Sequence, residues 1–335
     1  MTKGFIDIHH HFFPSTLNKA RINEDVGWQT PEGHLPWTPE LSLKFMDQAG
    51  IDTAILSFPA LSAGSVSEEN RALARERNTY MAKVCQDYPG RFDVEGALAE
   101  IAYAMDVLKS DGKYVGDKLY EPIWTELDSR QVTVFLHGTQ TPSSTPHPDQ
   151  MLGIPVVEVP NETFKAAAHL VVTTTKRKHP DVKIILSHLG GSTPFLSARV
   201  AALSNYMGCP LTPEEIISDF KTFYFDTALG AHEITLSCNA NVCHYPTACF
   251  SGRTFQVNSD FMYFTARVFI LHFDAAVSTD TANWYTKNLE DFYAEQTDVL
   301  KDITSRNALS LFPQGAATKI KKKLTQYNCI IGISF

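Results

Sequence analysis

The chain has 335 residues, 44% of them hydrophobic and 20% charged, so it is long enough to bury one large core or two ordinary ones. The formal net charge of -8 and the lack of a basic stripe exclude nucleic acid as a partner. No apolar run approaches the roughly 20 residues that span a bilayer. The first strand-like segment starts almost at Met1, which leaves no space for a signal peptide. We therefore expect a cytosolic protein that does not bind membranes.

The cysteines do not form a disulfide framework, because they are scattered in a long chain. They stand at Cys85, Cys209, Cys238, Cys243, Cys249 and Cys329. Those between Cys238 and Cys249, with His244, lack the two close ligand pairs of a zinc finger. We expect free thiols and no metal site there.

Runs rich in β-branched and aromatic residues predict short strands. They lie at residues 5–9, 51–58, 132–137, 183–188 and 222–226. Apolar residues spaced by three and four predict helices between them, at residues 68–86, 95–109 and 119–130. Asn161 is positioned to cap a further helix that ends before Pro180. Strands that alternate with helices indicate βαβ units, a parallel sheet and right-handed crossovers.

The simplest architecture is one (β/α)8 TIM-type barrel, which typically takes about 250 residues. No internal repeat or low-complexity linker divides the chain, so we assign residues 1–313 to a single domain. Strands 3 and 4 are shortened or irregular, since only residues 91–94 and 113–115 are available for them. Residues 237–267 lack a clear period and are expected to be an irregular insertion, and residues 314–335 a C-terminal tail.

Histidines at the end of the first strand indicate a metal site. Side chains at i and i+2 share a face of a strand, so Asp7, His9 and His11 point one way and His10 the other. Alpha carbons about 7 Å apart let two imidazoles meet one ion at about 2.0 to 2.1 Å. A chance run of histidines or an exposed strand end is the alternative interpretation.

Two more predicted strands also end in histidine. His137 and His188 close their strands, and a glycine-containing loop follows each. Several imidazoles at the C-terminal ends of successive strands predict a shared site at the mouth of a barrel.

A carboxylate is still needed, because neutral imidazoles leave the charge of a divalent ion uncompensated. Asp274 is the first candidate, since it ends the last strand-like segment before a final helix. Asp226 also ends a strand and is its rival, and Asp280 is a more distant third.

The motifs at residues 7–14 (DIHHHFFP), 135–138 (FLHG) and 186–195 (LSHLGGSTPF) together resemble the amidohydrolase-related decarboxylases. That family includes aminocarboxymuconate semialdehyde, γ-resorcylate and fungal 6-methylsalicylate decarboxylases. The loop 139–159 and the stretch 161–164 are most similar to the 6-methylsalicylate branch. The resemblance extends to about Leu236 and resumes over about 277–313.

The resemblance implies a Zn²⁺ ion, with Mn²⁺ as the other option, held by His9, His11, His137 and an aspartate of the last strand, here Asp274. It implies that His188 is an acid-base or orienting group and that Arg199 binds the substrate carboxylate. A surface salt bridge is the structural alternative for Arg199. Related enzymes are often dimers, so the resemblance also implies a homodimer. Members usually carry Gly-Thr-Asp-x-Pro at the last ligand, whereas residues 271–276 read LHFDAA.

The function implied is non-oxidative decarboxylation of an aromatic ortho-hydroxy acid similar to 6-methylsalicylate, with release of CO2. His188 and Asp274 are the expected catalytic residues, and a small aromatic carboxylic acid is the expected substrate. Two alternatives stay open: a metal-dependent hydrolase of an amide or lactone, and a defective barrel whose metal site does not close.

Overall fold

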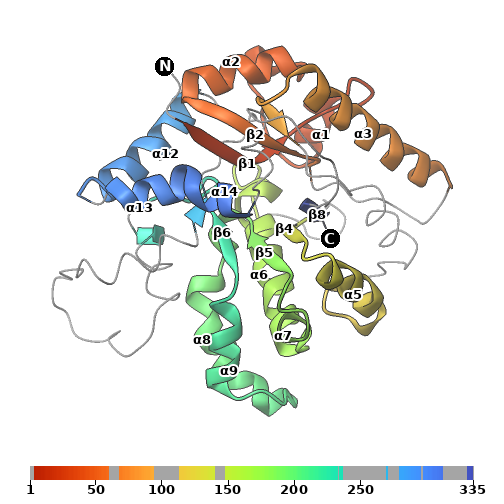
Figure 1. Ribbon diagram of the computed structural model, residues 1–335, viewed down its shortest axis with the longest axis vertical. Coiled ribbons are helices and arrows are strands. Elements are labelled where there is room, and N and C mark those ends of the chain that lie inside the picture. Colours follow the sequence, from red (N-terminus) through yellow and green to blue (C-terminus); the bar gives the residue numbers. More distant parts are fainter. Residues whose placement is uncertain are drawn as a thin grey trace.

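The computed structural model describes residues 4–59, 68–93, 113–139, 148–232, 234–236, 269–270, 279–295, 297–311 and 330–334. Strands lie near the centre of the molecule and helices lie around them (Figure 1). The predicted helix at 95–109, the predicted insertion at 237–267 and Asp274 fall outside the described residues. No helix in the described part of the chain has both the length and the apolar character that a membrane crossing requires.

The strands of the described residues form two sheets in which every pairing is parallel. The first has the order β1-β2-β3, with β1 at Phe5–His11, β2 at Ile51–Ser57 and β3 at Phe92–Asp93. The second has the order β7-β6-β5-β4-β8, with β4 at Thr133–His137, β5 at Lys183–Leu186, β6 at Tyr224–Asp226, β7 at Phe269–Ile270 and β8 at Ile330–Ser334. The parallel α/β architecture expected from the sequence is confirmed.

Helices connect and cover these strands. They are α1 (Lys19–Asp25), α2 (Pro39–Ala49), α3 (Glu68–Asp87), α5 (Glu121–Ser129), α6 (Ile154–Val172), α7 (Thr175–Lys178), α8 (Thr193–Leu203), α9 (Pro213–Phe220), α12 (Thr279–Phe292), α13 (Thr297–Lys301) and α14 (Asn307–Leu311). The predicted cap at Asn161 is wrong, because α6 already begins at Ile154 with Gly153 as its N-cap and continues through Pro160. Pro155, in the first turn of α6, is compatible with helix initiation.

In the part of the chain that the structure describes, the strands form two sheets and no closed ring, so closure into an eight-stranded barrel stays a prediction. The third strand has only two residues, and residues 113–115 form no strand. Next to β4 lies β8 instead, paired in register from Thr133 opposite Ile330 to His137 opposite Ser334. Part of the segment assigned to a tail therefore supplies a parallel strand where the sequence offered no fourth one.

An extra residue in β1 changes which side chains share a face. Between Asp7 and His10 the chain advances three residues while β2 advances two, from Ala54 to Leu56. Such a bulge resets the alternation of the strand. The prediction that Asp7 points with His9 and His11 is wrong, since the Asp7 carboxylate is hydrogen-bonded to the His10 ring.

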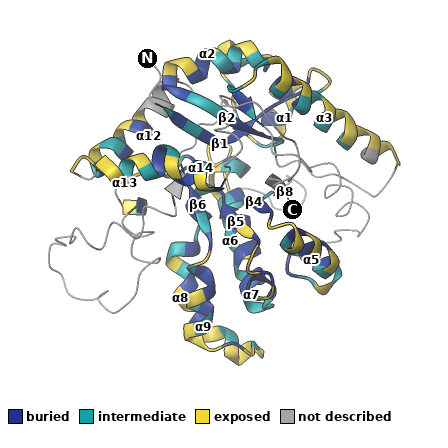
Figure 2. Ribbon diagram, viewed as in Figure 1, coloured by how far each residue is buried: buried dark blue, intermediate teal, exposed yellow. Residues whose placement is uncertain are grey.

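A small buried cluster joins the two sheets on the inside. Its residues come from β1, β2, β4, β5 and α14, and they are Ile8, Ile55, Phe135, Ile185, Ala308 and Leu311. A larger cluster fills the space between the strands and the outer helices. The helices around the strands turn buried faces inward and exposed faces outward (Figure 2).

Truncation of Phe135 tests whether this inner cluster holds the two sheets together. Phe135 is 2% exposed, and removal of a buried phenyl ring costs about 3–5 kcal/mol of unfolding free energy. We expect Phe135→Ala to lose that amount in urea denaturation, and Phe135→Leu to lose less. Phe195→Ala is the control, because Phe195 is 61% exposed. Equal losses in the two alanine variants would contradict a shared inner core.

Candidate metal centre

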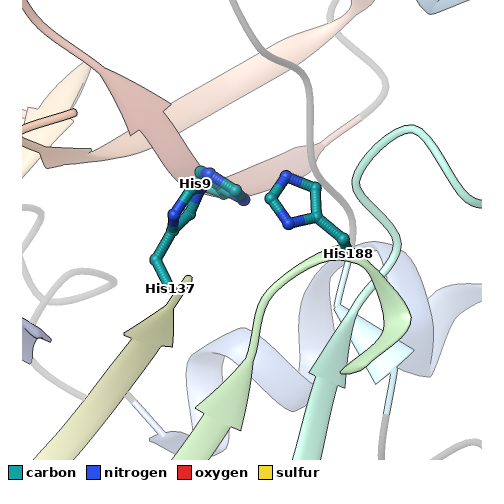
Figure 3. Close-up of side chains that lie close together, drawn as sticks. All are labelled: His9, His137 and His188. Carbon is teal, nitrogen blue, oxygen red and sulfur yellow. The ribbon is translucent and has the colours of Figure 1, made fainter. Parts of the chain in front are cut away.

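Four histidine rings from three strand ends lie together. His9 and His11 come from β1, His137 from the end of β4, and His188 from the short 3-10 helix His188–Gly190 that follows β5. The ring centroid of His9 lies 4.7 Å from that of His11, 4.9 Å from that of His137 and 5.3 Å from that of His188. Figure 3 shows the labelled rings of His9, His137 and His188 facing one another. One ring nitrogen from each of these three lies within 4.8 Å of the others.

A buried carboxylate orients the His9 ring. The Nδ1 atom of His9 lies 2.7 Å from Oδ2 of Asp226, and the two side chains are 1% and 0% exposed. An ionised carboxylate only accepts hydrogen bonds, so Nδ1 carries the proton and Nε2 keeps its lone pair. A carboxylate behind a histidine in this way fixes the ring orientation of metal ligands.

The other two predicted ligands are oriented in the same sense. His137 donates from Nδ1 to the carbonyl oxygen of Gly138 at 2.6 Å. Nδ1 of His11 lies 3.1 Å from the hydroxyl oxygen of Ser57 at the end of β2. Since Nδ1 is engaged in each ring, Nε2 is the nitrogen left to bind an ion.

The spacing of these nitrogens fits a divalent ion. Nε2 of His9 and Nε2 of His11 lie 3.0 Å apart. Two nitrogens bound to one ion at about 2.0 to 2.1 Å are about 2.9 to 3.4 Å apart in tetrahedral or octahedral geometry. Zinc and similar ions commonly bind imidazole nitrogens of rings whose other nitrogen is held by a hydrogen bond.

Asp226 is better suited to orient His9 than to bind the ion itself. Its Oδ2 faces His9, and its Oδ1 accepts hydrogen bonds from the backbone N–H of Ala228 at 3.1 Å and of Leu189 at 3.4 Å. The sequence placed Asp226 at a strand end but gave no sign of this orienting role. Asp274 lies outside the described residues, and Asp280 lies in the first turn of α12.

His188 reaches the cluster by an unusual backbone conformation. The backbone φ is 54° at His188 and 53° at Leu189. Both values lie in the left-handed region, which residues other than glycine rarely adopt. The turn brings the His188 ring to 4.8 Å from the His137 ring, between centroids. Strained backbone of this kind is often found at functional sites.

Arg199 is the residue that the resemblance implies for binding the substrate carboxylate. Arg199 is exposed on α8, and among the described residues it forms no salt bridge, which leaves the surface-pair alternative without support.

Of the cysteines, Cys85 and Cys209 are described and both are free thiols. Burial raises the pKa of the Cys85 thiol to about 12, so it is protonated and unreactive at neutral pH.

A second hydrogen-bonded chain lies on the outer side of β1. The Asp7 carboxylate accepts the backbone N–H of His9 at 3.0 Å and contacts Nδ1 of His10 at 2.8 Å. Nε2 of His10 is hydrogen-bonded to the Ser42 hydroxyl of α2. Ser42 is only 1% exposed, so this chain anchors β1 to α2 rather than presenting a nucleophile. The sequence did not predict it, because the bulge is not visible in the residue pattern.

Replacement of Asp226 tests the orientation of His9. Asp226→Asn keeps the shape but weakens the acceptor, so we expect Zn²⁺ affinity to fall about 10–100-fold. Calorimetric titration of the metal-free protein measures this, with circular dichroism to check the fold. Asp87→Asn is the control, since Asp87 pairs with Lys83 on an exposed face of α3. Unchanged affinity in Asp226→Asn would contradict the orienting role.

Comparisons with known proteins find a family model and relatives that match most of the chain. The family model described as amidohydrolase matches residues 6–231. The chain is 33% identical to the decarboxylase macB of Penicillium terrestre, over 96% of this chain and 98% of the relative. It is 35% identical to the 6-methylsalicylic acid decarboxylase acuB of Aspergillus aculeatus, over 70% of this chain and 79% of the relative.

Solved structures share the fold. A dihydroxybenzoic acid decarboxylase from Polaromonas, with bound manganese and an inhibitor, superposes with a TM-score of 0.70 at 19% identity, over 96% of this chain and all of that one. A 2,6-dihydroxybenzoate decarboxylase with 2,6-dihydroxybenzoate gives a TM-score of 0.68 at 19% identity, over 93% of this chain and 100% of the other. Since the family model covers more than half of the chain and relatives above 30% identity span most of it, the protein belongs to the amidohydrolase family.

Proposed function

We propose that this protein is a metal-dependent, non-oxidative decarboxylase of an aromatic ortho-hydroxy carboxylic acid similar to 6-methylsalicylate. The observation that carries the proposal is the convergence of four histidines. One ring nitrogen each of His9, His137 and His188 lies within 4.8 Å of the other two, and Nε2 of His11 lies 3.0 Å from Nε2 of His9. Relatives that span most of the chain are decarboxylases, and one of them acts on 6-methylsalicylic acid.

An exposed apolar segment at the start of α6 suits an aromatic ring. Met151, just before α6, and Val156, in its first turn, are 86% and 49% exposed, and both follow the strand of His137 in the sequence. Loops after the strands of such folds form the active site, and exposed apolar surface of this kind often binds ligands. This segment is our candidate for the surface that receives the substrate ring.

In the proposed reaction the chain fixes the substrate and moves one proton. A divalent ion held by His9, His11 and His137 would supply Lewis-acid polarisation of the substrate's carboxylate and ortho oxygen. His188 delivers a proton to the ring carbon that bears the carboxylate, which interrupts aromaticity. The bond from that carbon to the carboxylate then breaks, CO2 leaves, and the bonding electrons return to the ring. His188 regains its proton from water.

Several finer features are part of the proposal. We propose Zn²⁺ or Mn²⁺ as the ion, and manganese is bound in a structure of similar fold. Asp274 as a further ligand and catalytic residue, Arg199 as a carboxylate-binding residue, closure of the strands into a barrel over residues 1–313, a homodimer and a cytosolic location all stay predictions.

Metal removal together with a substrate screen tests the function. We expect a chelator to abolish CO2 release from 6-methylsalicylate and related hydroxybenzoates, and Zn²⁺ or Mn²⁺ to restore it. Hydrolysis of lactones or amides without CO2 release would instead support the hydrolase. Absence of a stoichiometric ion from the purified protein would support a defective site.

Replacement of His188 separates proton transfer from ion binding. Because general acid-base groups contribute about 10²–10⁴-fold to rate, we expect His188→Ala to lose at least about 100-fold in turnover. Its metal content should stay near that of the unaltered protein. His34→Ala is the control, since His34 lies in the 3-10 helix Glu32–His34 and is not one of the four clustered histidines. Full residual activity would remove His188 from the mechanism, and simultaneous loss of the ion would make it a ligand.

A further inference from the structure

One buried hydroxyl connects the ends of the strands that deliver His137 and His188. The Thr163 side chain, on α6, accepts the backbone N–H of Gly138 at 3.0 Å. Its Oγ1 also lies 3.0 Å from the Ser187 hydroxyl oxygen and 3.2 Å from the carbonyl oxygen of Val159. Gly138 directly follows His137, and Ser187 directly precedes His188.

These three contacts use the full hydrogen-bonding capacity of the hydroxyl. A threonine hydroxyl donates one hydrogen bond and accepts two. With its proton on the Val159 carbonyl, Thr163 accepts from both Gly138 and Ser187. Thr163 and Ser187 are each 0% exposed, so water does not compete for these bonds. The contacts therefore fix one strand end relative to the other.

Close backbone approaches hold the same part of α6 against both strand ends. A Cβ added at Gly138 would lie 2.1 Å from the Val159 carbonyl oxygen, and one at Gly191 would lie 1.9 Å from the Pro160 carbonyl oxygen. Only glycine permits such proximity. Asn161 adds a side-chain bond, because its Oδ1 accepts the Ser192 hydroxyl at 2.7 Å. Residues 159–163 thus contact the chain just after His137 and just after His188.

We propose that Thr163 is a positioning residue that sets the separation of His137 and His188. The inference rests on the proposed function, in which His137 binds the ion and His188 moves the proton. The separation matters because a group that transfers a proton must lie within hydrogen-bond reach of the reacting atom. Thr163 acts on the two rings through their chain neighbours, Gly138 and Ser187.

Thr163→Val tests the proposal, because it keeps the side-chain shape and removes the hydroxyl. With Co²⁺ as the probe, we expect a changed visible absorption spectrum, about 10-fold or greater loss of Co²⁺ affinity, and a fall in kcat for 6-methylsalicylate larger than any rise in KM. Thr163→Ser restores the hydroxyl and should return all three values to near those of the unaltered protein. Thr175→Val is the control, since Thr175 is a 3% exposed threonine on α7.

Ser187→Ala keeps the test decisive should Thr163→Val fail to fold. It removes the contact on the His188 side alone, so kcat should fall while the Co²⁺ spectrum and affinity stay unchanged. If the unaltered protein releases no CO2, the proposed function fails, and the Co²⁺ spectrum and affinity of Thr163→Val still decide the positioning role. Spectrum, affinity and kcat in Thr163→Val equal to those of Thr175→Val would overturn it, as would a failure of Thr163→Ser to recover.

Discussion

The bond between the His9 ring and the Asp226 carboxylate is the interaction on which the site depends. It joins residues 217 positions apart and links β1 of the first sheet to β6 of the second. A buried carboxylate is costly unless it is hydrogen-bonded, and Asp226 meets this condition through His9 and the backbone N–H groups of Ala228 and Leu189. The same contact holds the proton of His9 on Nδ1. One hydrogen bond therefore both links the two sheets and sets the tautomer of His9.

Much of this site could be predicted because its chemistry lies at strand ends. His9, His11, His137 and His188 each close a hydrophobic segment, and parallel strands bring such ends to one edge. The orienting partners could not be predicted in the same way. Ser57 and Asp226 also end strands, yet a serine or an aspartate at that position is common, and only the packing of β1 against β2 and β6 shows which ring each one meets.

The parallel α/β structure was predicted from the alternation of strands and helices in the sequence. The strand pattern located β1, β2, β4, β5 and β6, and the very short strand expected at residues 91–94 contains β3. Residues 330–334 pair with β4 although local composition indicated a tail. An edge strand has unpaired backbone N–H and C=O groups, and any extended segment that reaches it can form hydrogen bonds with them. The start of α6 was placed too late, since Pro160 reads as a helix breaker but lies inside the helix.

The bulge in β1 gives the two faces of this strand different tasks. Without the extra residue, Asp7 would point with His9 and His11 and add a third polar group to the site. With it, Asp7 and His10 face α2 and form a chain to Ser42. His9 is then held twice, by Asp7 at its backbone N–H and by Asp226 at its ring. Donors fixed in this way before an ion arrives lose little freedom on binding it, and this preorganisation favours tight coordination.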